Sequence, residues 1–125
     1  MSVKHRVNFL TVQQNHDLNH ACRALALADF HTYHVGSSCK RADYHDVDLR
    51  CILFDDEFAA MALDKPDRLA FLNAAISFWL AQRTGLPIDF QFQQMTEANQ
   101  KYPGCRNYVG MIIDRAAALT AHVPG

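Results

Sequence analysis

The sequence predicts an α/β fold in which a mixed sheet of three to five strands is flanked by helices. Three segments have the apolar pattern of strands, at residues 30–35, 46–54 and 86–92. Two longer segments, 15–29 and 64–84, have apolar residues at helical spacing instead. Strands and helices that alternate along a chain are typical of a sheet covered by helices.

Composition limits the class of protein. The chain has 125 residues, 50% of them apolar, so we expect one domain over residues 1–125. The formal net charge of −1 argues against the broad basic surface of general nucleic-acid-binding proteins. The sequence has no apolar stretch of the signal-peptide or membrane-spanning type, so we expect a cytoplasmic protein without a membrane association. The cysteines have no Cys-x-x-Cys spacing, which favours reduced thiols over structural disulfides or zinc.

The helices can be placed from their end signals. Asn15 is the predicted N-cap of a helix that continues to about Asp29, and residues 3–12 before it are interpreted as an edge strand or an arm. The clearest helix begins at Asp64-Lys65-Pro66-Asp67 and stops at Gly85. Its apolar face is wide enough to serve both core packing and a homodimer surface. Further helices are predicted to begin at the acidic run 55–57 and to cover 96–102 and 111–123.

One turn and the strand after it contain a candidate phosphate-and-metal site. Gly36, Ser37 and Ser38 form a turn whose main-chain N–H groups could point at phosphate oxygens, because glycine lets the backbone approach closely. Asp46 and Asp48 stand at the head of the next apolar run. In a strand they would point the same way, with Cα atoms about 6.6 Å apart, and could share a divalent cation.

A third carboxylate follows on a later strand. Ile88, Phe90 and Phe92 alternate with polar residues, so one face of this strand is buried and Asp89 lies on the other. Between the turn and the first pair of aspartates, Lys40 and Arg41 are placed where they could neutralise a triphosphate. A solvated charged loop is the alternative interpretation of these two residues.

Together these residues resemble the signature of the DNA polymerase β-type nucleotidyltransferase superfamily, which has a Gly-Ser turn, an Asp-x-Asp strand and a third acid on a neighbouring strand. The matching residues are Gly36, Ser37, Asp46, Val47, Asp48 and Asp89, and the resemblance covers about residues 15–93. The segments 85–94 and 96–99 also resemble small bacterial and phage proteins that have this motif. His45 stands where the family commonly has a small hydroxyl residue, and Arg50 where it is often apolar, so the substrate is left open.

The resemblance implies a specific chemistry. Asp46 and Asp48 would hold two Mg²⁺ or Mn²⁺ ions on a nucleoside triphosphate such as ATP, and Asp89 would ligate the ion nearest the acceptor. Gly36 and Ser37 would hold the β- and γ-phosphates, with Ser38, Lys40 and Arg41 around them. A nucleoside monophosphate would pass to a hydroxyl of an unknown acceptor, which is a small molecule, a protein or an RNA end, and pyrophosphate would be released.

Two other functions are compatible with the same residues. The first is a nucleotide-binding or antitoxin-like protein of the same fold that catalyses little and has a toxin-like partner. The second is an interaction module whose aspartates are solvated strand ends. Pyrophosphate release separates the transferase from the binding protein, and metal-dependent nucleotide binding separates both from the interaction module.

Overall fold

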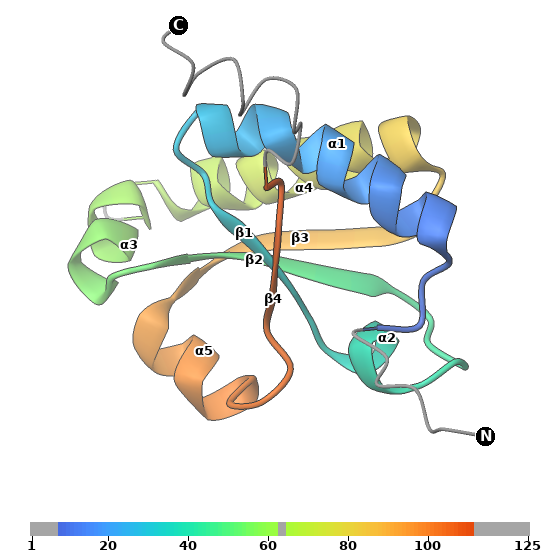
Figure 1. Ribbon diagram of the computed structural model, residues 1–125. Helices are drawn as coiled ribbons and strands as arrows, with labels where there is room; N and C mark the ends of the chain where they lie inside the picture. Colours follow the sequence, from blue (N-terminus) through green and yellow to red (C-terminus); the bar gives the residue numbers. More distant parts are fainter. Residues whose placement is uncertain (1–7, 63–64, 112–125) are drawn as a thin grey trace, which may run out of the picture.

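The computed structural model describes residues 8–62 and 65–111, and it has a four-stranded mixed sheet flanked by helices (Figure 1). This confirms the predicted fold class. The strands are β1 (Thr32–Val35), β2 (Val47–Leu53), β3 (Ile88–Gln94) and β4 (Asn107–Val109), in the order β3-β2-β1-β4. β1 is antiparallel to both β2 and β4, whereas β2 and β3 are parallel.

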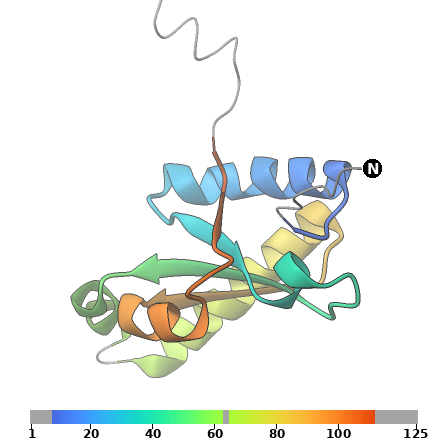
Figure 2. The same ribbon diagram turned by 60° about the horizontal axis from the view of Figure 1, so that its bottom comes forward.

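The helices cover both faces of this sheet. They are α1 (Val12–Leu27), α2 (Ser37–Lys40), α3 (Asp55–Ala62), α4 (Pro66–Thr84) and α5 (Met95–Lys101). α1 and α4 lie on one face, while α2 and α5 lie on the other (Figures 1 and 2). None of the helices in the described part of the chain is long and apolar enough to span a membrane. The helix predicted at 111–123 lies, apart from Met111, outside the described residues.

The core lies between the sheet and the pair α1 and α4. Alternate residues of the parallel strands face it, as the sequence predicted, and they pack against apolar residues of the two helices. Its buried members include Leu18, Cys22, Val47, Leu49, Cys51, Leu80, Phe90 and Phe92. Residues between these positions on β2 and β3 therefore face α2 and α5, where the candidate site lies.

The start of α1 differs from the prediction. Thr11, not Asn15, is the N-cap: its hydroxyl accepts a hydrogen bond from the Gln14 N–H at 3.0 Å, and the Gln14 side chain accepts one from the Thr11 N–H at 2.8 Å. This reciprocal pair satisfies two N–H groups that the first turn leaves without partners. The strand or arm expected over residues 3–12 is wrong at its end because Val12 is already helical, and residues 3–7 lie outside the described part.

The central helix α4 is confirmed. Gly85 ends it in the left-handed conformation (φ 74°) and donates its N–H to the Ala81 carbonyl. The N-cap is Lys65, whereas the predicted Asp64 lies outside the described residues. Phe71 and Phe78 are 70% and 67% exposed, so part of the wide apolar face is not used by the core. A homodimer through this face stays a prediction.

Candidate active site

Asp48 and Asp89 form the centre of the candidate site. They are direct neighbours in the parallel register of β2 and β3. Asp46 precedes β2, so the prediction that it lies within the strand is wrong, but it remains close to the pair. Burial raises the pKa of Asp48, and the carboxylates of Asp89 and Asp46 raise it further, although Arg50 acts in the opposite direction. The fold therefore places Asp89 and Asp46 each near Asp48.

The glycine turn lies against this carboxylate pair. β1 ends at Val35, which is paired with Asp48, and Gly36 follows with φ 81° and ψ −159°. A Cβ atom at Gly36 would be 2.2 Å from Oδ2 of Asp48. Glycine is thus required here both by its backbone conformation and by the closeness of the carboxylate.

A cavity of about 280 Å³ opens beside the turn. It is lined by Gly36, Ser37, Lys40, Arg41, Lys101 and Tyr102. Residues 37–40 form a short helix, so Lys40 lies in α2 rather than in the loop that was expected. The two sequence-predicted basic residues and the predicted turn thus share one cavity, and Asp48 lies against the Gly36 that lines it.

Lys101 and Tyr102 are site residues that sequence reasoning missed. They lie at the end of α5 and belong to no motif, so only the packing of α5 beneath the sheet brings them to the turn. Lys101 also pairs with Glu97 at 3.8 Å. Tyr44, the aromatic residue of the loop before β2, is partly buried against the core. Tyr102 is the aromatic side chain that lines the cavity.

Arg50 is a fixed cation within the carboxylate cluster. It is only 5% exposed, and its Nη1 donates to the main-chain oxygens of Leu49 (2.9 Å) and Asp89 (2.8 Å). Its Nη2 lies 3.4 Å from Oδ2 of Asp89 and 3.5 Å from the Tyr102 hydroxyl. Because main-chain groups hold the guanidinium, its charge stays beside Asp89. The departure from the family pattern noted at this position therefore has a direct effect on the site.

A buried histidine positions α2. His34 is inaccessible to solvent, and burial lowers its pKa to about 4, so the ring is neutral near pH 7. Its Nδ1 accepts a hydrogen bond from Nδ2 of Asn8 (3.3 Å), which leaves Nε2 to donate to the Ser38 hydroxyl. The Phe9 N–H donates to the Ser38 carbonyl at 2.8 Å. The Ser38 side chain therefore faces the interior, and only its main chain could meet a ligand.

The three acids fit a divalent cation by their chemistry. Carboxylate oxygens are the ligands that Mg²⁺ and Mn²⁺ prefer, and Mg²⁺ usually keeps several waters beside one or two carboxylates. Burial is the main cause of the raised pKa of Asp48, and the nearby carboxylates of Asp89 and Asp46 add to it; a bound cation would offset both effects. Among the described residues, however, no group of three or more His, Cys, Asp or Glu side chains lies close enough together to hold a metal ion. A cation shared by Asp46, Asp48 and Asp89 would therefore require these side chains to move toward one another.

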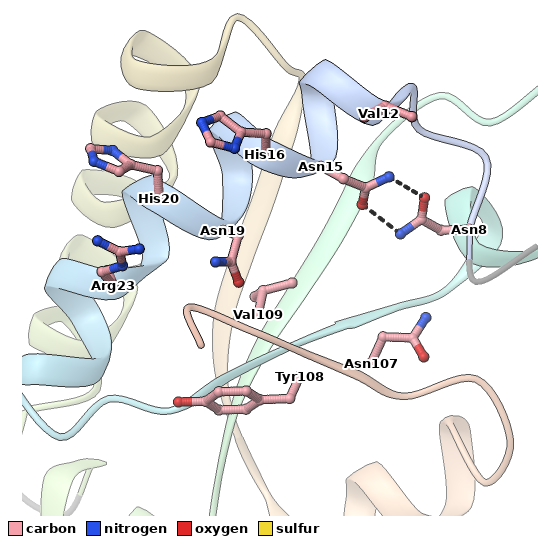
Figure 3. Close-up of a pocket in the computed structure, with 10 residues that line it drawn as sticks. All are labelled: Asn8, Val12, Asn15, His16, Asn19, His20, Arg23, Asn107, Tyr108 and Val109. Carbon is pink, nitrogen blue, oxygen red and sulfur yellow. Dashed lines mark hydrogen bonds between the residues drawn. The ribbon is translucent and has the colours of Figure 1, made fainter. Parts of the chain in front are cut away.

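A larger cavity of about 510 Å³ lies between α1 and β4 (Figure 3). Three of the side-chain amides that line it already make hydrogen bonds within the protein. Asn8 and Asn15 donate to each other at 2.8 and 3.0 Å, and Asn19 accepts from the N–H groups of Gly110 and Met111. These contacts attach the segment before α1 and the end of β4 to the helix. We therefore place the candidate site at the smaller cavity, where charged groups converge.

Comparisons of the chain with protein-family models, with curated proteins and with solved structures found no match. The function is therefore argued from the chemistry of the site.

Proposed function

We propose that this protein is a metal-dependent nucleotidyltransferase that moves a nucleoside monophosphate from a nucleoside triphosphate to a hydroxyl-bearing acceptor and releases pyrophosphate. One observation supports this most strongly. Asp48 and Asp89 are opposed on parallel strands, with the Gly36 turn against Asp48 and a cavity lined by basic residues beginning at that turn. Carboxylates that could bind a metal ion thus lie next to a cavity whose basic residues could bind phosphates.

The distribution of charge supports a triphosphate as ligand. Lys40, Arg41 and Lys101 contribute three cations to the cavity, and all three are exposed. The carboxylates next to them would repel an anion unless a cation lay between the two. Mg²⁺ bound by protein carboxylates commonly bridges to substrate phosphates in this way. The proposed ligand is therefore a metal–triphosphate complex, with ATP as the first candidate.

The roles of the side chains follow from their positions. Asp46, Asp48 and Asp89 would hold the divalent ions, which supply Lewis acidity and neutralise the phosphate charge when they are bound. The hydroxyl and main chain of Ser37, with the three cations, would bind the terminal phosphates. Asp89, on the strand beyond β2, would orient the attacking hydroxyl and accept its proton. Tyr102 would offer a ring at the edge of the cavity.

Arg50 favours a second candidate function. Its guanidinium already pairs with Asp89 at 3.4 Å and is held in place by main-chain carbonyls. A carboxylate oxygen that already pairs with a fixed guanidinium is less available to a metal ion or to an attacking hydroxyl. This favours a nucleotide-binding or antitoxin-like protein that keeps the metal–triphosphate site near Asp48 but transfers slowly.

The test is turnover of each of the four labelled nucleoside triphosphates with Mg²⁺ or Mn²⁺, with a cell extract as the source of acceptor. We expect pyrophosphate release and label transfer by the natural protein. Asp89→Asn should retain nucleotide binding but lose on the order of 10² or more in rate, as expected for a lost base or metal ligand. Asp56→Asn is the matched control, because Asp56 is an exposed acid of α3 outside the cluster.

Each result selects among the candidates. Transfer that Asp89→Asn abolishes and Asp56→Asn preserves supports the transferase. Metal-dependent nucleotide binding without transfer supports the binding protein. A protein that neither binds nor transfers nucleotide would overturn both.

A further inference from the structure

Two cysteines that are far apart in sequence lie side by side next to the basic cavity. Nδ2 of Asn107 is 3.7 Å from Sγ of Cys39 and 3.6 Å from Sγ of Cys105. Cys105 is also close enough to Cys39 to help raise the pKa of the Cys39 thiol, although burial is the larger cause. None of the four cysteines is in a disulfide.

The pair joins the two walls of the cavity. Cys39 lies in α2, between the wall residues Ser37 and Lys40. Cys105 follows Tyr102, which lines the opposite wall at the end of α5. A covalent bond between the two sulfurs would therefore fix the distance between the turn and the end of α5.

We propose that Cys39 and Cys105 form a reversible disulfide under oxidation by a hydroperoxide, and that this bond limits the entry of a triphosphate into the cavity. The formation of the disulfide is independent of the proposed function, whereas its effect on triphosphate entry rests on that function. A reversible rather than permanent bond is expected because Cys105 is partly exposed, and a disulfide that solvent thiols can reach is readily reduced.

The exposure of the two thiols sets the order of the chemistry. Cys105 is half-buried, whereas Cys39 is 5% exposed and donates its S–H to the His34 carbonyl at 3.4 Å. Burial raises the pKa of Cys39, which makes it a poor primary target. The hydroperoxide therefore oxidises Cys105, forming a sulfenic acid and the corresponding alcohol or water. The Cys39 sulfur then attacks the Cys105 sulfur, the S–O bond breaks, and the hydroxyl leaves as water with the Cys39 proton.

The other two cysteines are protected from this reaction. Cys22 and Cys51 are buried in the core, and burial raises the pKa of each to about 12. Neither is therefore a reactive thiolate near neutral pH. Oxidation should select the pair beside the cavity.

The test is intact-mass spectrometry and peptide mapping after treatment of the full chain with hydrogen peroxide. We expect the loss of two hydrogens, a crosslinked pair of peptides containing Cys39 and Cys105, and full recovery with dithiothreitol. Cys39→Ser should instead accumulate oxygen at Cys105, and Cys105→Ser should leave Cys39 unmodified. Cys22→Ser is the matched control and should crosslink like the natural protein. A different pairing, or no crosslink, would overturn the disulfide.

A second measurement tests its effect on the cavity. The oxidised protein should melt on the order of 10 °C higher than the reduced protein, because the bond closes a long loop. It should bind ATP with Mg²⁺ at least tenfold more weakly than the reduced protein, and the Cys39→Ser protein should lose this difference. Equal ATP affinity in both redox states would overturn the regulatory part. If neither state binds ATP, the mass and melting data still decide the disulfide, while the triphosphate part fails together with the proposed function.

Discussion

Gly36 and Asp48 are in a contact that no other residue at position 36 could make. A Cβ atom at Gly36 would come within 2.2 Å of Oδ2 of Asp48, and the φ angle of 81° is one that side chains disfavour. The sequence suggested that this glycine makes room for a phosphate. The structure shows that it makes room for a carboxylate of the candidate site, while its role toward a phosphate stays a prediction.

We therefore predict that Gly36→Ala displaces Asp48 as well as straining the turn. The free energy of unfolding should fall by about 1 to 3 kcal/mol, the usual cost of a side chain in a glycine conformation. Binding of metal and ATP should weaken together, because one change moves both the turn and the carboxylate. Chemical denaturation and calorimetric titration measure the two effects.

The double variant Gly36→Ala with Asp48→Ala separates the two causes of this loss. It removes the clash but keeps the unfavourable φ angle. It should therefore recover part of the stability that Gly36→Ala loses, but none of the metal binding. A Gly36→Ala protein with natural stability and natural metal affinity would contradict the contact.

Asp48→Asn should stabilise the protein when metal is absent. The pKa of Asp48 is raised in the folded state, so its contribution to stability is complete below its ordinary pKa and is lost as the pH rises through the folded value. At pH 7 in a chelator, the asparagine variant should therefore melt a few degrees higher than the natural protein, and the difference should disappear near pH 3. Millimolar Mg²⁺ or Mn²⁺ should raise the melting temperature of the natural protein much more than that of Asp48→Asn. An equal rise in melting temperature in both proteins would show that the metal does not bind at Asp48.

Arg50→Met should make the carboxylate cluster more dependent on metal. The guanidinium is buried and its removal leaves two main-chain carbonyls without this donor, so stability in a chelator should fall by about 1 to 3 kcal/mol. Asp89 loses its fixed counter-charge, and the rise in melting temperature on adding Mn²⁺ should become larger than in the natural protein. Arg83→Met, which removes an exposed arginine stacked on Trp79, is the control for a general loss of charge. A smaller Mn²⁺ shift in Arg50→Met than in the natural protein would show that Arg50 supports the metal site instead of competing with it.

His34 should make stability fall in mild acid. Its pKa is lowered from 6.5 to about 4 by burial, so its contribution is complete above pH 6.5 and is lost as the pH falls toward 4. The loss is about 3 kcal/mol from this residue alone. His34→Gln keeps one acceptor for Asn8 and one donor for Ser38 but cannot titrate. The free energy of unfolding in urea is measured for both proteins at several pH values, and the difference between them removes the contribution of the other titratable groups. Parallel pH curves would refute the assignment to His34.

The pattern of residues was sufficient for features that depend on local geometry. Side chains alternate along a strand, so Val47 and Leu49 on one face and Asp48 on the other could be predicted without a structure, as could Phe90 and Asp89. Gly85 was predicted as the end of α4 because only glycine adopts the left-handed conformation there without cost. The N-cap of α1 was misplaced because Asn15 and Thr11 are both residues that cap helices, and the capping box of Thr11 with Gln14 decides between them.

Only the tertiary structure decided how these pieces meet. Nothing in the pattern indicates that β2 and β3 are parallel and in a register that opposes Asp48 to Asp89. Nor does it indicate that Arg50 reaches the Asp89 carbonyl or that Cys39 and Cys105 lie against the same Asn107 amide. β4 is too short to show periodicity, and Lys101 reaches the cavity only because α5 packs beneath the sheet. The physical reason is that periodicity records which face of a segment is buried, whereas the pairing of distant segments depends on the packing free energy of the whole chain.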